Sequence, residues 1–491
     1  MTRAEFELLS GYGSHPLDEA VTPGGSLRPA YEPVFEVLDT IGSGGLAERD
    51  RRLAAVRAEQ GLIFTAPVDG VLRDQVFPLD VVPRIIGTAT WAHLSSGAAQ
   101  RARALNAFLA DVYADRPAGD PARIVADGVI PDRLVRRAPG YLEAAAGLVP
   151  PEVARASVYG LDLLTDEEGR WVVLEDNLQV PSGLAYALAN RRTAAAVLPE
   201  LYEMAAEVAS PETLGGLFRA ALAGARPAGC RTDPQIAVLS DGPANSAWYE
   251  HRTLAAEMGV PVVLPADLHA VGDGVGIRTA DGELRIDVLY RRLGNDELID
   301  QPENAPGRLV KQAMRSGTLT MANAPGNGVA DDKAIYAFVG PMIRYYLGEE
   351  PILADVGTWV LADPQQYEAV RGRMDQLVVK PVDGSGGEGV MIGPELTEQQ
   401  VLDLEAEVAA NPYRYIAQEV VRFSTHPTLV GDRVRPRHVD LRIFALSSSP
   451  TSVVVPPVGL TRVARQSAGL LVNSSQGGGS KDTWIPDAPV G

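Results

Sequence analysis

Residues 377–393 read LVVKPVDGSGGEGVMIG, and the rest of the fold prediction is built outward from them. The pattern predicts a strand over 376–381, a glycine-rich loop over 383–389 and a second strand after the loop. Glycines let backbone N–H groups turn inward around phosphate oxygens, and Lys380 at the strand end adds a positive charge. The loop lacks the Gly-Lys-Ser/Thr of a P-loop, and its strand-to-strand context excludes a dinucleotide fingerprint. Taken alone, the stretch also fits a flexible hairpin with a solvated lysine.

A second glycine run, NSSQGGGSK, covers residues 473–481 near the end of the chain. It offers further backbone donors for an anion. By itself it is equally consistent with a plain linker.

Residues 157–177 predict a β-hairpin around the acidic turn TDEEG. If Asp166 pairs with Trp171 across a four-residue loop, counting outward places Asp162 opposite Glu175. Asn177, two residues further, shares their face because side chains alternate along a strand.

Like charges directly opposite each other destabilise a hairpin unless something positive lies between them. Asp162, Glu175 and Asn177 are hard oxygen ligands with no His or Cys nearby, which favours Mg²⁺, with Mn²⁺ as the alternative, over zinc. The competing interpretation is a solvated acidic hairpin. The Gly- and Pro-containing segment 178–183 that follows favours a site.

Two later strands carry polar residues in apolar surroundings. The first, 415–421, contains Gln418 and Glu419, and the second, 438–446, places His438, Asp440 and Arg442 on one face. Arg442 could clamp a phosphate with its planar set of donors. A polar face turned to water is the alternative.

Composition limits the classes of function. The chain has 491 residues, with 44 Lys+Arg against 63 Asp+Glu, a net charge of -19 and a pI near 4.8, so its bulk charge repels nucleic acid and anionic membranes. One cysteine, Cys230, excludes an intrachain disulfide and favours a reducing compartment. The first ten residues lack a long apolar core, and no run of about 18 apolar residues follows. We therefore expect a cytoplasmic protein that binds neither nucleic acid nor membrane; a homo-oligomer remains possible.

Four regions follow from the pattern along the chain. We expect an extended N-terminal entry segment over 1–50, helices and the hairpin over 51–230, an open α/β layer over 235–325, and a strand-rich region over 330–491. The α/β layer is predicted from alternating strands and a helix that begin at Gln235.

Together these motifs resemble the ATP-grasp superfamily, in its circularly permuted branch, and are similar to the ATP-binding half of glutathionylspermidine synthases. Ordinary ATP-grasp enzymes place the metal ligands last, whereas here Asp162 and the Glu175-Asp-Asn177 run come first. The phrases VADDKA at 329–334 and VNSSQGGG at 472–479 resemble family signatures. The resemblance implies an α/β (α+β) ATP-grasp fold in which the pre-ATP-grasp layer at 235–325 separates the two halves.

The resemblance also implies a role for each matching position. Lys380 would touch the α- and β-phosphates, and Lys333 would help hold the nucleotide. The loop would close over the phosphates, the 418–421 segment would meet adenine and ribose, and Arg442 would sit near the γ-phosphate. The implied nucleotide-binding residues are Lys333, Lys380, Gly384, Ser385, Gly386, Gly387, Gln418, Glu419, Val421, Arg442 and Asn473. Arg442 and Lys380 would be catalytic, and Asp162, Glu175 and Asn177 would hold the metal.

The activity implied is that of an ATP-dependent carboxylate–amine ligase, which forms an amide or peptide bond through an acyl phosphate and releases ADP and phosphate. Small-molecule or peptide acids and amines would be the substrates. The alternatives are a small-molecule kinase and a non-catalytic nucleotide-binding partner protein.

Overall fold

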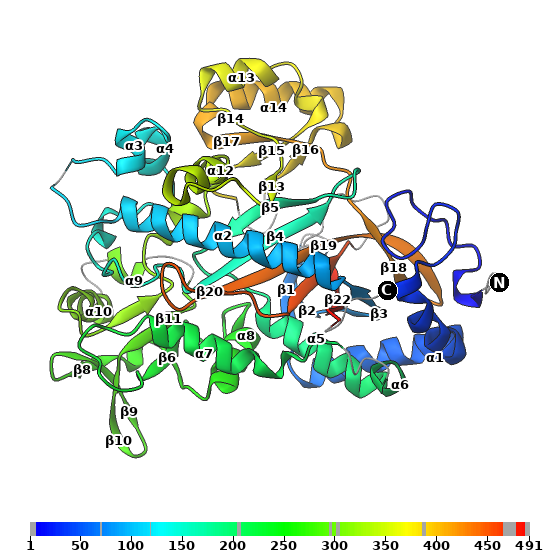
Figure 1. Ribbon diagram of the computed structural model, residues 1–491, viewed down its shortest axis with the longest axis horizontal. Coiled ribbons are helices and arrows are strands. Elements are labelled where there is room, and N and C mark those ends of the chain that lie inside the picture. Colours follow the sequence, from blue (N-terminus) through cyan, green and yellow to red (C-terminus); the bar gives the residue numbers. More distant parts are fainter. Residues whose placement is uncertain are drawn as a thin grey trace.

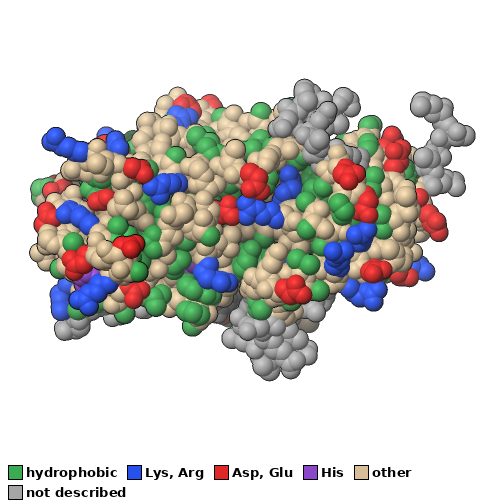
Figure 2. Space-filling view, turned by 90° about the horizontal axis from the view of Figure 1, so that it is seen from below, with side chains coloured by type: hydrophobic (Ala, Val, Ile, Leu, Met, Phe, Trp, Pro, Cys, Tyr) green, Lys and Arg blue, Asp and Glu red, His purple; other side chains and the backbone are tan. Residues whose placement is uncertain are grey.

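The structure is a computed structural model that describes residues 6–68, 71–117, 119–203, 208–293, 297–300, 305–384, 389–464 and 478–486. Within these ranges, the helices are too short or too polar to cross a membrane. Figure 2, which views the molecule from below, shows basic and acidic side chains interspersed over that face.

A large central sheet contains strands from both early and late in the sequence (Figure 1). Its strands lie in the order β13-β5-β4-β19-β21-β22-β3, and β18 and β20 also pair with β19. Their bounds are β3 Leu79–Ile85, β4 Val158–Thr165, β5 Trp171–Asn177, β13 Ala354–Asp355, β18 Thr425–Val430, β19 Arg433–Ser447, β20 Val453–Val454, β21 Gly459–Val463 and β22 Gly479–Trp484. Early strands β3–β5 therefore share one sheet with strands from the last third of the chain, as the permuted order predicts.

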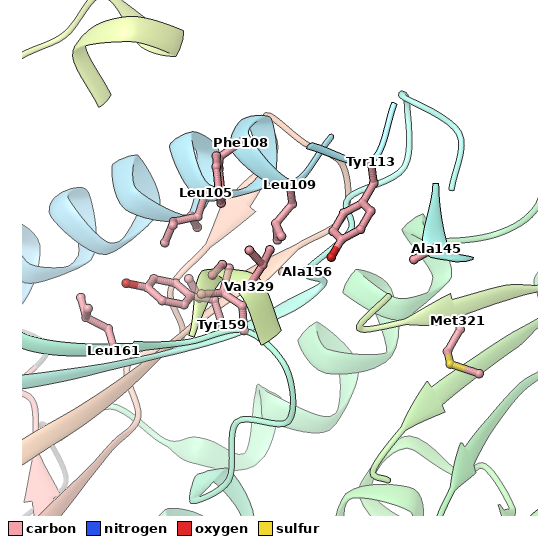
Figure 3. Packing of buried hydrophobic residues seen from close by; sticks show 14 of the residues in the cluster. Leu105, Phe108, Leu109, Tyr113, Ala145, Ala156, Tyr159, Leu161, Met321 and Val329 are labelled. Atoms are coloured by element: carbon pink, nitrogen blue, oxygen red, sulfur yellow. The ribbon is translucent and has the colours of Figure 1, made fainter. Parts of the chain in front are cut away.

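Helix α2, Thr88–Val112, covers one face of this sheet. Leu105, Phe108 and Leu109 recur at three- and four-residue steps, which places them on one side of the helix. Figure 3 shows them directed toward Tyr159 and Leu161 of β4. Helix α2 is one of the helices expected within residues 51–230.

The opposite face is covered by helices α5, Leu184–Val197, and α7, Leu214–Gly224. Leu184 and Leu188 of α5 join the buried cluster that contains Phe444 of β19 and Leu460 of β21. This packing holds the loop before α5 close to the middle of the sheet.

The expected extended segment over 1–50 is wrong for its second part, because helix α1 spans Glu32–Glu59. Val34, Phe35 and Leu38 are buried on one helical side, within an apolar run too short to distinguish a strand from a helix by periodicity. The glycines at 42–45 obscured the continuity: Gly42 has φ 71°, so the helix bends there instead of ending.

Residues 235–325 contain the expected open α/β layer. Its four parallel strands lie in the order β12-β11-β6-β7, helix α8 packs beside β6 and β7, and helix α10 packs against β8 and β9. A three-stranded antiparallel sheet, β8 to β10, adjoins it (Figure 1). The bounds are β6 Ile236–Leu239, α8 Trp248–Met258, β7 Val262–Val263, β8 His269–Val271, β9 Gly274–Thr279, β10 Gly282–Ile286, β11 Val288–Arg291, α10 Ala305–Arg315 and β12 Thr320–Ala322.

A small antiparallel sheet, ordered β14-β17-β15-β16, forms a separate lobe at the top of Figure 1. Its bounds are β14 Thr358–Val360, β15 Leu377–Pro381, β16 Met391–Ile392 and β17 Tyr415–Glu419, with helices α13 Pro364–Val370 and α14 Glu398–Ala410. Leu377 and Val379 of β15 pack on Leu404 and Val408 of α14. The described start of the glycine-rich loop, residues 383–384, follows β15 in this lobe.

The remaining elements are short. They include the hairpin β1 Ile63–Val68 with β2 Val71–Val76, and helices α3 Arg123–Ala126, α4 Asp132–Arg136, α6 Pro199–Glu203, α9 Glu297–Asp300, α11 Lys333–Tyr336 and α12 Val339–Met342. The strand-rich region expected over 330–491 begins with helices, the pair α11 and α12, followed by a π turn over Ile343–Leu347.

The backbones at Gly140 and Gly328 pass in close contact, shortly before the chain enters α11. A Cβ added to Gly140 would lie 2.2 Å from the carbonyl carbon of Gly328, so the two backbones would have to separate. We expect Gly140→Ala to lower the free energy of unfolding by about 1–3 kcal/mol. Gly44→Ala in α1 is the control, because its Cβ would meet nothing within 4 Å and alanine favours helix. Equal urea midpoints for the two variants would contradict this prediction.

Candidate active site

The hairpin β4–β5 pairs Asp162 with Glu175, as predicted, although the register of the turn differs from the predicted one. Thr165, not Asp166, pairs with Trp171, so the predicted turn register was wrong by one residue. An irregularity between Asp162 and the next pair restores the expected alignment.

The side chain of Asp166 explains the longer turn. It accepts hydrogen bonds from the backbone N–H groups of Glu168 and Arg170 at 3.0 and 2.8 Å. These bonds close a five-residue loop between the strands. The strands accommodate the extra loop residue because Leu174 has no partner on β4 and forms a β-bulge.

The positive charge next to Asp162 is supplied by arginine. Arg442 of β19 lies opposite Asp162 in register and donates to its carboxylate from Nε at 2.5 Å and from Nη2 at 2.7 Å. Arg462 of β21 donates a third bond at 2.9 Å. Burial would raise the pKa of Asp162, but the two guanidinium groups hold that pKa well below its usual range.

Asp440 completes a buried network of two carboxylates and two guanidiniums. It accepts from Arg462 Nε at 2.9 Å and Nη2 at 2.6 Å. Asp440 is only 2% exposed, so this part of the predicted polar face of β19 is turned into the protein and not toward water. Arg442 also donates to the carbonyl oxygen of Ser182 at 2.9 Å, which ties it to the loop before α5.

Lys333, at the start of α11, connects the central sheet with the glycine-rich loop. Its Nζ donates to Glu175 Oε1 at 3.0 Å and to the carbonyl oxygen of Gly384 at 2.5 Å. The ammonium therefore spans the two lobes.

Lys380, at the end of β15, faces the same space. The pKa of Lys380 is lowered to about 8, chiefly by burial and secondarily by the charge of Lys333, while Glu175 and Asp162 act in the opposite direction. These influences show that the two sequence-predicted lysines and two predicted carboxylates lie near one another.

Asp176, between Glu175 and Asn177, anchors β5 from the opposite side of the sheet. Arg101 of α2 donates to its carboxylate at 3.0 and 2.6 Å and to Asp355 at 2.6 Å. Tyr159 O–H also donates to Asp176. The backbone that carries Glu175 and Asn177 is thereby held on a buried charged anchor.

Oxygen donors suited to a divalent cation lie at the open edge of this arrangement. The Glu175 side chain is 31% exposed, and the buried Asn177 Nδ2 has no hydrogen-bond partner. Nδ2 is a hydrogen-bond donor, so this orphaned group is suited to a phosphate oxygen, and Asn177 would have to offer its Oδ1 to a metal. The described residues contain no group of three or more His, Cys, Asp or Glu side chains that could hold a metal, so phosphate oxygens would have to complete its shell. Both oxygens of Asp162 are engaged by arginines, and its role as a metal ligand stays a prediction.

The 418–421 segment connects the small lobe with the central sheet. Gln418 Nε2 donates to Thr358 Oγ1 at 2.9 Å, and its buried Oε1 has no partner. Glu419 is exposed, while Val421 packs against Leu164 and Val172. Four predicted nucleotide-binding residues, Ser385, Gly386, Gly387 and Asn473, lie outside the described residues.

Two residues of this site were missed in the sequence. Arg462 lies in the apolar strand GLTRV, where an arginine beside small and apolar residues is the only signal. Asp331 lies in the VADDKA phrase and accepts from the N–H of Leu178 at 2.6 Å. Burial, and secondarily the charge of Glu175, raise the pKa of Asp331 to about 7 against the opposing effect of its backbone hydrogen bonds.

The fold and these charged groups define an ATP-grasp architecture with permuted strand order. The family model described as circularly permuted ATP-grasp type 2 matches residues 83–464. The chain belongs to this family.

Relatives extend over nearly the whole chain. A Frankia alni protein named "Putative glutamate--cysteine ligase 2-3" is 46% identical over 484 residues, which are 98% of this chain and 55% of that protein. A similarly named Frankia casuarinae protein is 45% identical, and the chain again spans 55% of its length. An uncharacterized Synechocystis protein is 40% identical over 474 residues, 95% of this chain and 96% of the relative.

Among solved structures, a glutathione synthetase-like effector from Globodera pallida, in its apo form, superposes with a TM-score of 0.55. The match covers 90% of this chain and 97% of the effector at 12% sequence identity. At that identity the likeness supports the fold alone.

Proposed function

We propose that the chain is an ATP-dependent carboxylate–amine ligase that works through an acyl phosphate and releases ADP and phosphate. The observation that carries the proposal is the meeting of Lys333, Lys380, Glu175 and the Arg442–Asp162 pair between the two lobes. Membership of the ATP-grasp family and the ligase names of the two Frankia relatives support it.

The residues present can position and neutralise phosphates without a side-chain nucleophile. Phosphoryl transfer is governed by placement and electrostatic stabilisation. Lys380 and Lys333 would compensate phosphate charge, and Arg442 would meet the charge that develops on the transferred group. Asp162 holds the guanidinium group of Arg442 in one orientation, so this group does not have to reorient during the reaction.

Glu175 and Asn177 would hold a divalent cation together with phosphate oxygens, with Mg²⁺ favoured and Mn²⁺ the alternative. When bound, the metal would neutralise phosphate charge. Gln418, through its unpartnered Oε1, would accept a hydrogen bond from the adenine amino group.

The acid substrate would bind beside the carboxyl ends of β11 and β6 in the parallel sheet of residues 235–325. Arg292, just after β11, donates to the carbonyl oxygen of Pro181 at 2.7 Å and to Ser182 Oγ at 2.5 Å, and its buried Nε has no partner. Glu250 of α8 accepts from Gly183 N–H at 2.7 Å, and its Oε1 also lacks a partner. Ligands of open α/β sheets bind at the carboxyl ends of strands where the strand order reverses, which here is between β11 and β6.

The test incubates the full chain with ATP, Mg²⁺, a panel of amino acids and short peptides, and hydroxylamine. We expect a hydroxamate together with ADP and phosphate, because amines trap acyl phosphates. Lys380→Ala should remove the signal, and Lys311→Ala on α10 should preserve it. Phosphate retained on a stable product would replace the ligase with a kinase, and AMP with pyrophosphate would indicate adenylation of the acid.

Nucleotide affinity should fall as the pH rises through about 8. The pKa of Lys380 is lowered to about 8, so in the free protein the ammonium that attracts phosphate is lost above that pH. Calorimetry between pH 6.5 and 9.5 measures the fall. Lys380→Arg should flatten the profile, because arginine stays charged over this range. The same fall in wild type and Lys380→Arg would contradict the assignment.

A further inference from the structure

A second cavity lies away from the candidate active site, beside the β18–β19 hairpin. Its volume is about 390 Å³, within the range of roughly 300–1,000 Å³ that is common for small-molecule sites. Its polar lining consists of His15, Thr425, Arg435, Arg437 and His438. Figure 1 shows β18 beside the N-terminal segment that carries His15.

The basic side chains of this cavity have no carboxylate of their own. In the described part of the chain, Arg435 Nη1 donates to the carbonyl oxygen of Gly11 at 3.5 Å and Arg437 Nη1 to that of Pro436 at 3.1 Å, and neither arginine forms an ion pair. Burial lowers the pKa of Arg437, and the like charge of Arg435 lowers it further. In a chain with a net charge of -19, an uncompensated basic cluster is unexpected.

Asp18 and Glu19, which follow His15 closely in the chain, are engaged elsewhere. Asp18 accepts from the N–H groups of Ala20 and Val21 at 2.9 and 2.8 Å, and from Thr425 Oγ1 at 3.0 Å. Glu19 is paired with Arg84 at 2.6 Å. Neither carboxylate is among the residues that line the cavity.

The two imidazole rings are held by their Nδ1 atoms. His15 Nδ1 accepts from Leu17 N–H at 3.2 Å, and His438 Nδ1 donates to the carbonyl oxygen of Phe423 at 2.9 Å. The ring centroids are 5.9 Å apart. His15, which accepts at Nδ1, therefore carries its donor N–H at Nε2, whereas neutral His438, which donates from Nδ1, has an acceptor at Nε2. His438 is only 8% exposed, so it belongs to the wall of the cavity.

We propose that this cavity binds the phosphoryl group of a small dianion. Two guanidinium groups and the Nε2–H of His15 offer more donors than a single carboxylate can accept, whereas a phosphoryl dianion has three oxygens and a charge that balances both arginines. The proposal is independent of the ligase assignment, because it uses none of the residues placed at the candidate active site.

The test measures the binding of pyrophosphate by calorimetry at constant ionic strength, in the Lys380→Ala background so that the candidate ATP site contributes little. We expect Arg437→Gln and Arg435→Gln each to weaken binding about tenfold or more, since a charge-assisted contact is lost. Arg433→Gln, an exposed arginine of the same strand outside the cavity, is the matched control and should change affinity less than twofold.

Inorganic phosphate and citrate show whether the cavity selects phosphoryl groups or binds carboxylates instead. Binding of phosphate as well as pyrophosphate supports a phosphoryl site, whereas binding of citrate alone would overturn the ligand class. Unchanged pyrophosphate affinity in both cavity variants, with melting temperatures like that of the control, would overturn the site itself.

Discussion

Arg442→Lys is expected to lower ATP-dependent turnover about 100-fold or more. Removing one preorganised donor to a developing charge has effects of that size, and lysine cannot reproduce the two parallel bonds that Arg442 makes to Asp162. The measurement is release of ADP and phosphate by the full chain at saturating ATP. Arg433→Lys, on the exposed end of the same strand, should retain normal turnover.

Asp162→Asn should lower turnover by a similar factor, and the double variant should be little worse than either single one. When two residues act as one unit, removing either one already abolishes their joint contribution to turnover, so removing the second costs little more. The dependence on Mg²⁺ then separates two roles for Asp162. An unchanged Mg²⁺ requirement fits a residue that orients Arg442, while a strongly raised requirement would establish Asp162 as a metal ligand. Fully additive losses would show that the pair does not act as a unit.

Arg101→Met is expected to lower the free energy of unfolding by about 3–5 kcal/mol, because it leaves the buried carboxylate of Asp176 without its partner. The Arg101 and Asp176 side chains are each 1% exposed, so water cannot replace the lost bonds. Urea-induced unfolding, followed by circular dichroism, measures the change.

Arg103 provides the matched control on the same helix. Its pair with Glu349 is 30% and 39% exposed, so Arg103→Met should change stability by only about 0.2–1 kcal/mol. Asp176→Asn in the Arg101→Met background should recover part of the loss, because the orphaned charge is then removed. Equal losses for Arg101→Met and Arg103→Met would show that the buried network contributes little.

Much of the fold could be predicted because its signals are local. The strand, glycine loop and strand at 377–393 require only neighbouring residues, and so does the alternation that identified the parallel layer after Gln235. The first half of helix α1 was missed because local glycines concealed a helical spacing that becomes evident only when Phe35 and Leu38 are seen to be buried.

For the candidate site, the sequence by itself indicated which residue types gather and predicted Asp162 opposite Glu175, an alignment that the structure reaches only through the bulge at Leu174. Only the tertiary structure decided what neutralises each of them. Arg442 is 280 residues from Asp162 in the chain, and Lys333 is 158 residues from Glu175. Such pairings depend on the order of strands in the central sheet, which brings β4 and β19 side by side. Hairpin periodicity could predict that two carboxylates need a positive neighbour, but it carries no information about which distant strand supplies the charge.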